Sequence, residues 1–139
     1  MSSCCGGEAT KIIYSCSGAA DVGELSDKVT RALRKEGYAQ GSCIAALGAG
    51  MSGYIQSAKG ADVNITIDGC PVACTRKILE NIGVAPVSYI ITDMGFTKGS
   101  TAVTVEAITT ICNNIRKGKS NSAKEHSSSG CGCSCGGKC

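Results

Sequence analysis

Two cysteines four residues apart are the side chains of this sequence best suited to chemistry. Cys70 and Cys74 lie in the stretch Ile67-Asp68-Gly69-Cys70-Pro71-Val72-Ala73-Cys74, between an apolar, β-branched run and a helical pattern. At a turn from a strand into a helix, backbone N–H groups are free and the helix dipole is positive. That environment favours the thiolate, which is the form that binds metals and attacks electrophiles. If both cysteines lie on the first helical turn, the spacing puts the two sulfurs on one face.

Further cysteines allow a larger site. The chain has 11 cysteines, and Cys16 and Cys43 could join Cys70 and Cys74 as four thiolates, a ligand set that zinc binds tetrahedrally. The spacing differs from paired C-x-x-C knuckles, so Cys16 and Cys43 could instead be small buried residues, as free cysteines often are. An all-thiolate site also suits an iron–sulfur cluster.

Short strands and helices that alternate along the chain must position these thiols. The sequence predicts strands at residues 11–15, 63–67 and 87–91 and helices at residues 22–36, 71–82 and 101–115. Residues 38–62 follow no clear pattern. The alternation is typical of an α/β domain with three layers, in which helices flank a mainly parallel sheet, as in Rossmann-like or flavodoxin-like folds.

In a parallel sheet, ligands bind beyond the carboxyl ends of the strands. The predicted strand ends carry Cys16, Cys70 with Asp68, and Asp93. The two aspartates could orient metal ligands, and Asp68 could equally cap the turn before Pro71. For Cys43, the prediction depends on the structure of the segment around it. It reaches this edge only if residues 42–50 form a helix or loop packed over it, because a parallel strand beginning at residue 42 would put Cys43 at the far edge.

The composition changes on both sides of the predicted domain. We expect a flexible N-terminus at residues 1–7, an α/β metal-binding domain at residues 8–117, and a flexible Ser-, Gly- and Cys-rich tail at residues 118–139. The tail holds Cys131, Cys133, Cys135 and Cys139, which could bind soft metals, carry sulfur between partners, or have only adventitious metal affinity. His126, in the same segment, is expected to be a solvated surface residue.

Charge and hydropathy exclude several classes of function. The net charge is only +3, its charges are interleaved, and aromatic residues make up 4% of the chain, so we expect no nucleic-acid partner. No apolar run approaches the roughly 20 residues of a membrane span, and the N-terminus lacks the pattern of a secretory signal. We therefore expect a cytoplasmic protein that does not bind membranes. In that compartment, so many cysteines indicate metal or thiol chemistry rather than disulfides.

Two other motifs offer competing interpretations. Cys70-x5-Arg76 has the frame of phosphatase and arsenate-reductase loops, in which the cysteine is the nucleophile. Against this frame, Pro71 removes one N–H donor and the loop has no internal glycine. Gly48-x-Gly50-x-x-Gly53 matches a dinucleotide fingerprint, but no acidic residue follows at the required distance, so a glycine-rich bend between two short helical pieces is the simpler interpretation. Cys112 falls on the apolar face of the last helix and is expected in the core.

Several of these motifs together resemble the DGC-domain family, which is named for a central Asp-Gly-Cys. The resemblance runs over residues 11–116 and includes Cys16-Ser17-Gly18, Cys43 ahead of Ala45-Ala46-Leu47-Gly48-Ala49, Asp68-Gly69-Cys70 with Cys74, and the segment from Thr92 to Lys98. The family is described as zinc-binding through four cysteines. The resemblance implies that Cys16, Cys43, Cys70 and Cys74 are its ligands here, and it implies no reaction.

The sequence thus predicts a zinc-binding protein, with a metal ion as its ligand, that handles metal or sulfur together with its tail and a protein partner. We assign no catalytic residues. A thiol enzyme that uses Cys70 as its nucleophile, either like a phosphatase or arsenate reductase or as a sulfur transferase, is the alternative function. A domain whose fold zinc merely stabilises is a third.

Overall fold

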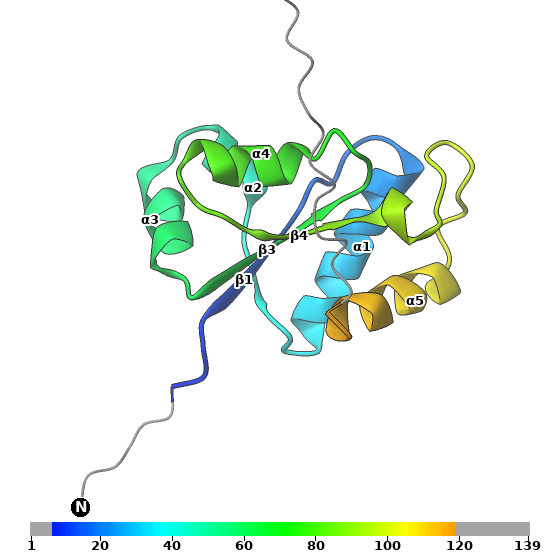
Figure 1. Ribbon diagram of the computed structural model, residues 1–139, viewed down its shortest axis with the longest axis horizontal. Coiled ribbons are helices and arrows are strands. Elements are labelled where there is room, and N and C mark those ends of the chain that lie inside the picture. The colour runs from blue at the N-terminus through cyan, green and yellow to red at the C-terminus, as the bar shows by residue number, and fades with distance from the viewer. Residues whose placement is uncertain (1–6, 119–139) are drawn as a thin grey trace, which may run out of the picture.

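A four-stranded, all-parallel sheet forms the centre of the computed structural model, which describes residues 7–118 (Figure 1). In chain order the elements are β1 (Lys11–Ser15), α1 (Asp21–Lys35), β2 (Gln40–Gly41), α2 (Ile44–Gly48), α3 (Ser52–Gly60), β3 (Val63–Asp68), α4 (Cys74–Asn81), β4 (Val87–Ile90), the 3₁₀-helix η1 (Ile91–Met94) and α5 (Val105–Arg116). The strand order is β2-β1-β3-β4, which matches the first four strands of the flavodoxin-like arrangement.

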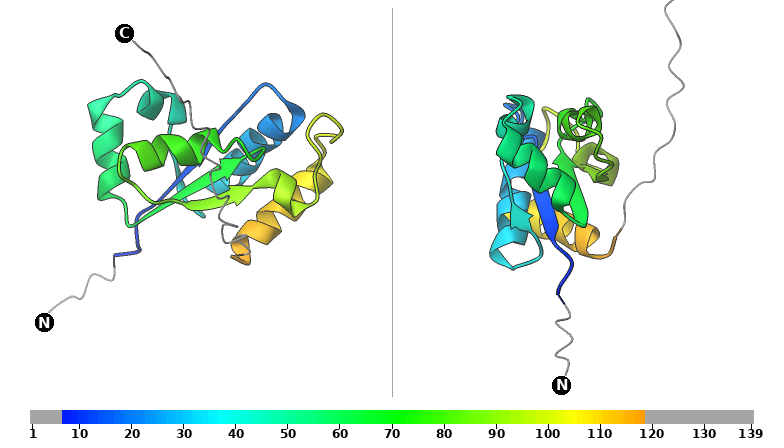
Figure 2. Two further views of the ribbon diagram at one scale, coloured as in Figure 1. Left: turned by 45° about the horizontal axis from the view of Figure 1, so that its top comes forward. Right: turned by 90° about the vertical axis from the view of Figure 1, so that its left-hand side faces the viewer.

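The central strands are buried on both faces, which requires helices on both sides of the sheet. Nearly every residue of β1 and β3 is buried, and Tyr14 pairs in register with Thr66, which pairs in turn with Ser88 of β4. Helices α1 and α5 pack on one face, whereas α2, α3 and α4 pack on the other. Figures 1 and 2 show the strands running between these two groups. The predicted three-layer α/β fold is confirmed.

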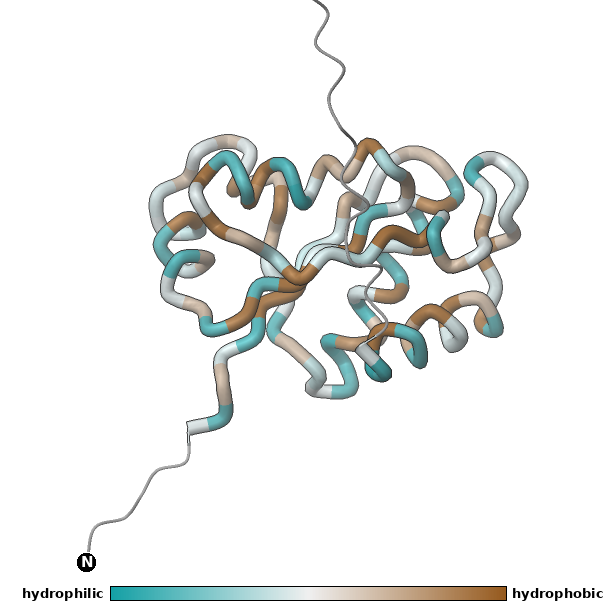
Figure 3. Tube along the Cα trace, viewed as in Figure 1, coloured by the Kyte–Doolittle hydropathy of each residue, from teal (hydrophilic) through white to brown (hydrophobic). Residues whose placement is uncertain are grey.

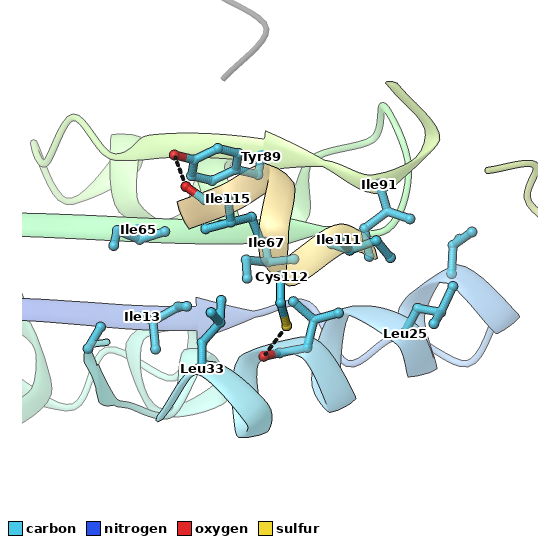
Figure 4. Packing of buried hydrophobic residues seen from close by; sticks show 13 residues of the cluster. Ile13, Leu25, Leu33, Ile65, Ile67, Tyr89, Ile91, Ile111, Cys112 and Ile115 are labelled. Carbon is cyan, nitrogen blue, oxygen red and sulfur yellow. Dashed lines mark hydrogen bonds between the residues drawn. The ribbon is translucent and has the colours of Figure 1, made fainter. Parts of the chain in front are cut away.

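The larger core lies between the sheet and the pair α1 and α5 (Figure 4). Ile13, Leu33, Ile67 and Ile111 are fully buried there, and each such side chain stabilises the fold by about 1.5–3 kcal/mol. Cys112 lies in the same cluster, where its Sγ approaches the backbone carbonyl oxygen of Val29. Burial raises the pKa of the Cys112 thiol. The prediction that Cys112 is a core residue is confirmed.

A smaller core fills the opposite face, under α2, α3 and α4. Tyr14 and Leu79 are fully buried in it, and the Tyr14 hydroxyl donates to Oδ1 of Asn64. The Asn64 side-chain amide donates in turn to the carbonyl of Ala58, so this polar pair within the layer is satisfied. Figure 3 shows the apolar segments of the chain gathered along the strands and on the inner sides of the helices.

The structure differs from the sequence prediction in three segments, one of which is the helix predicted at residues 101–115, since α5 begins only at Val105. Residues 38–62, where no element was predicted, contain β2, α2 and α3. The predicted helix at residues 71–82 begins only at Cys74, because residues 70–73 form a turn in which the Ala73 N–H donates to the Cys70 carbonyl. Ala73 itself has a left-handed backbone, with φ of 50°, which no α-helical residue adopts. Pro71 is therefore part of this turn and not the first residue of a helix.

Within residues 7–118, no helix is long and apolar enough to cross a membrane. The predicted flexible tail lies outside the described residues apart from Gly118, and so do His126 and the four cysteines of the tail. The predicted N-terminal segment also lies outside them apart from Gly7.

Candidate functional site at the carboxyl edge of the sheet

Three of the four candidate cysteines follow neighbouring strands. Cys16 comes directly after β1, Cys43 shortly after β2, and Cys70 shortly after β3. Since β2, β1 and β3 are adjacent and parallel, their carboxyl ends lie at one edge of the sheet. Cys43 lies at this edge because it follows the carboxyl end of β2 and precedes α2, so it is not at the start of a parallel strand.

Helices α2 and α4 position Cys43 and Cys74. Cys43 immediately precedes α2, and Cys74 is the first residue of α4. The two helices pack against each other on the same face of the sheet, and Gly48 of α2 lies beside Ile78 of α4. Both cysteines are exposed, so their side chains are free to change rotamer.

Cys16 and Cys70 follow the two adjacent strands whose connections go to opposite faces of the sheet. From β1 the chain enters α1 on one face, whereas from β3 it enters α4 on the other. The two connections diverge between β1 and β3, and such switch points are where open α/β sheets bind their ligands. Cys16 and Cys70 are both half-buried in this region.

The Cys16 sulfur lies among hydrogen-bond donors. The Gly69 N–H donates to Cys16 Sγ across 3.4 Å, and the buried Ser26 hydroxyl lies 3.2 Å from the same sulfur. The Ser26 hydroxyl proton is directed to the Gly23 carbonyl, so the Cys16 thiol donates to Ser26 when it is protonated. A thiolate at Cys16 would keep the Gly69 donor, and such a hydrogen bond stabilises negative charge on sulfur.

The glycine of the Asp-Gly-Cys motif is required by packing. A Cβ on Gly69 would lie 2.8 Å from the carbonyl carbon and oxygen of Val22 and 2.9 Å from the Gly23 nitrogen. Gly23 is equally confined, because its Cβ would lie 2.3 Å from the Gly18 carbonyl oxygen. These contacts press the start of α1 against the loop that carries Cys70 and so bring the Cys16 and Cys70 connections together.

The motif's aspartate caps α4. Asp68 is 1% exposed, and its two carboxylate oxygens accept from the backbone N–H groups of Thr75, at 2.9 Å, and Arg76, at 3.2 Å. A carboxylate at the first turn satisfies free N–H groups and complements the helix dipole. Of the two roles predicted for Asp68, the structure gives it the capping role, although it caps the helix rather than the turn before Pro71.

This cap weighs against the phosphatase-like interpretation. In that chemistry the amides at the helix start hold the substrate oxyanion. Here the N–H groups of Thr75 and Arg76 already hold Asp68, and the Arg76 guanidinium lies 3.5 Å from Glu80 one turn further along α4.

The dinucleotide fingerprint also lacks its required setting. Gly48 ends α2, and Gly53 lies in α3, so the motif joins two helices instead of a strand and a helix. The simpler interpretation, a glycine-rich bend, is confirmed.

Cys70 lies in the turn before α4, so it does not share a helical turn with Cys74. The predicted alignment of the two sulfurs by helical spacing is therefore wrong, and the cause is the left-handed residue Ala73 between them. Cys70 packs against the edge of the larger core, and Lys98 Nζ lies 3.8 Å from its sulfur. Asp93, the other predicted orienting residue, is exposed in η1, directly after β4.

The four thiols are suitable ligands for zinc, although their sulfur atoms are not close enough to one another to bind one ion in this structure. Within residues 7–118, no three side chains of His, Cys, Asp or Glu lie close enough together to hold a metal ion. Four thiols at one edge are nevertheless the donors that zinc prefers. Binding would require the exposed side chains of Cys43 and Cys74 to turn toward Cys16 and Cys70.

Sequence reasoning missed several residues that build this edge. Ser26 sits in a helix as an ordinary polar residue, and Gly23 gives no local signal. Asp21 accepts from the N–H of Gly99, which is 78 residues further along the chain.

Known proteins resemble this chain over most of the described region. A protein-family model described as the DGC domain matches residues 12–115. The anaerobic and virulence modulator AnvM of Pseudomonas aeruginosa is 28% identical over 79 residues, which cover 57% of this chain and 60% of AnvM. The chain thus matches less than two thirds of the length of this relative. No solved structure matches the chain significantly.

Proposed function

Because this chain belongs to the DGC domain family, we propose that it binds a metal ion, with zinc as the first candidate, through four cysteine thiolates. The proposed ligands are Cys16, Cys43, Cys70 and Cys74. The observation that carries the proposal is the strand order, since β2, β1 and β3 are adjacent and each is followed by one of these cysteines.

The residues around the site support this function. Zinc, when bound, would supply a positive charge that holds thiolates together. The Gly69 N–H would keep the Cys16 sulfur oriented, and the Asp68 cap would fix the start of α4 and with it Cys74. Cys43 and Cys74 are exposed, so solvent reaches two of the four ligands directly. An exposed edge of this kind suits metal exchange better than a site that only stabilises a core.

We further propose that metal or sulfur passes between this edge and the cysteines of the tail, or a protein partner with similar thiols. Closely spaced thiols bind soft metals, and a thiolate that attacks the outer sulfur of a partner's persulfide takes up that sulfur while the partner leaves as a thiolate. A thiol enzyme that uses Cys70 remains the alternative. The lysine beside Cys70 favours it, whereas the occupied amides of α4 oppose it.

Protection of thiols by zinc separates these two functions. The experiment uses the full chain with Cys4, Cys5 and the four tail cysteines changed to serine, so that only the thiols of residues 7–118 react. We expect one equivalent of zinc to slow anaerobic alkylation of all four proposed ligands, as mapped by peptide mass spectrometry. Cys112 is the internal control, because its burial keeps it slow with or without zinc. Equally rapid alkylation of Cys70 with and without one equivalent of zinc would reject the metal site and favour the enzyme.

A further inference from the structure

A preformed turn precedes α5 at the edge that carries the cysteines. The Thr97 N–H donates to Thr101 Oγ1 at 3.0 Å, and the Thr101 hydroxyl donates back to the Thr97 carbonyl at 2.7 Å. The Ser100 N–H donates to the same carbonyl, and Gly99 has φ of +86°, a conformation that glycine adopts without strain. Residues 97–101, which we term the lysine turn, are thus held in one shape by their own hydrogen bonds.

Asp21 fastens the lysine turn to the start of α1. One carboxylate oxygen accepts from the Gly99 N–H and the other from the Thr101 N–H, each at 2.8 Å. These donors hold the pKa of the Asp21 carboxyl below its usual range, with the bond from Gly99 contributing most. Figure 2 shows the segment between η1 and α5 projecting on the same side of the molecule as the connection from β1 to α1.

Lys98 lies inside this fastened segment. Its Nζ is 3.8 Å from Cys70 Sγ, a distance at which an ammonium donates a hydrogen bond to sulfur. Arg76, the cation nearest to Cys70 in sequence, is paired with Glu80. The Asp21 contacts hold the backbone directly after Lys98, and the exposed Lys98 ammonium places a positive charge beside Cys70 Sγ.

We propose that Lys98 is a positioning residue, whose charge draws small anionic partners to the Cys70 sulfur. Cys70 then reacts with such partners in preference to neutral ones. This inference rests on the proposed function and deepens it: the carrier that exchanges metal at Cys70 is anionic, such as a small thiol that bears carboxylates and whose thiolate replaces Cys70 as a ligand. Unit charges about 4 Å apart interact by about 1 kcal/mol even in water, which corresponds to a several-fold preference in rate.

Paired alkylating reagents test this proposal without any metal. Iodoacetate is anionic and iodoacetamide is neutral, yet both consume the same thiolate, so the ratio of their rates reports charge near the sulfur. In the metal-free full chain, we expect Lys98→Gln to lower this ratio at Cys70 about two- to fivefold. Lys98→Arg should preserve the ratio, and added salt should lower it in the wild type but not in Lys98→Gln, because ions screen exposed charges.

Matched controls make the result specific. Lys59→Gln removes the same charge from α3, where Lys59 lies beside the amino end of β4, and it should leave the ratio at Cys70 unchanged. The exposed Cys43 is the internal reference in every variant. An unchanged ratio at Cys70 in Lys98→Gln, or an equal fall at Cys43, would overturn the inference. A specific fall at Cys70 in a protein that fails to bind zinc would uphold it and reject only the proposed function.

Discussion

Changing Cys70 to serine is expected to reduce zinc affinity by at least about 100-fold. A serine hydroxyl is a poor substitute for a thiolate, and even the partners that only orient metal ligands change affinity by about 10- to 100-fold. Cys70 also follows β3, beside the switch point between β1 and β3. Competition titration against a chromophoric zinc chelator measures the change, again with Cys4, Cys5 and the tail cysteines replaced by serine.

The matched control is Cys112→Ser. Cys112 is 2% exposed in the core and lies on α5, so its loss should lower stability but leave zinc affinity unchanged. Equal affinities in Cys70→Ser and the parent protein would remove Cys70 from the ligand set. Equal losses in Cys70→Ser and Cys112→Ser would mean that zinc affinity merely follows the stability of the fold.

Gly69→Ala is expected to reduce the free energy of unfolding by about 2–4 kcal/mol, because overpacking against atoms that cannot rotate away forces the backbone to shift. The new Cβ would lie 2.8 Å from backbone atoms of Val22, at the start of α1. Urea denaturation monitored by circular dichroism gives the change. In the same variant, displacement of α1 should also break the hydrogen bond from Gly69 to Cys16.

Gly53→Ala is the control for this substitution. Gly53 lies in α3, and a Cβ there would meet nothing within 4 Å. Alanine should therefore leave stability unchanged or raise it by about 0.5–1 kcal/mol through its higher helix propensity. If Gly69→Ala were as stable as Gly53→Ala, the close approach of α1 to the Cys70 loop would be wrong.

Periodic burial explains why much of the fold could be predicted from sequence. The strands β1 and β3 are short β-branched runs buried on both faces, and α1 and α5 carry apolar residues at helical spacing. The segment of residues 38–62 lacks such a signal because β2 has only two residues, both exposed, and α3 buries only Ala58. Its elements depend on contacts with the rest of the sheet, which local patterns do not encode.

The candidate site was predictable only as far as residue types reveal it. Thiols are recognisable in a sequence, and strand ends indicate which of them share an edge. The left-handed conformation of Ala73 could not be predicted from the sequence, because alanine is the residue most favourable to a helix. Lys98 lies beside Cys70 in a turn whose Gly99 and Thr101 donate to Asp21, far away in sequence, and long-range hydrogen bonds of this kind have no sequence pattern.

The most direct test of the central claim is zinc K-edge X-ray absorption on the full chain that retains only the cysteines of residues 7–118. We predict about one zinc per chain, with four sulfur neighbours at about 2.3 Å and no nitrogen or oxygen ligand. Replacing Cys16 or Cys70 with serine should abolish this signal. Failure of the parent protein to retain zinc, or a zinc shell unchanged after both cysteines are replaced, would contradict the four-thiolate site.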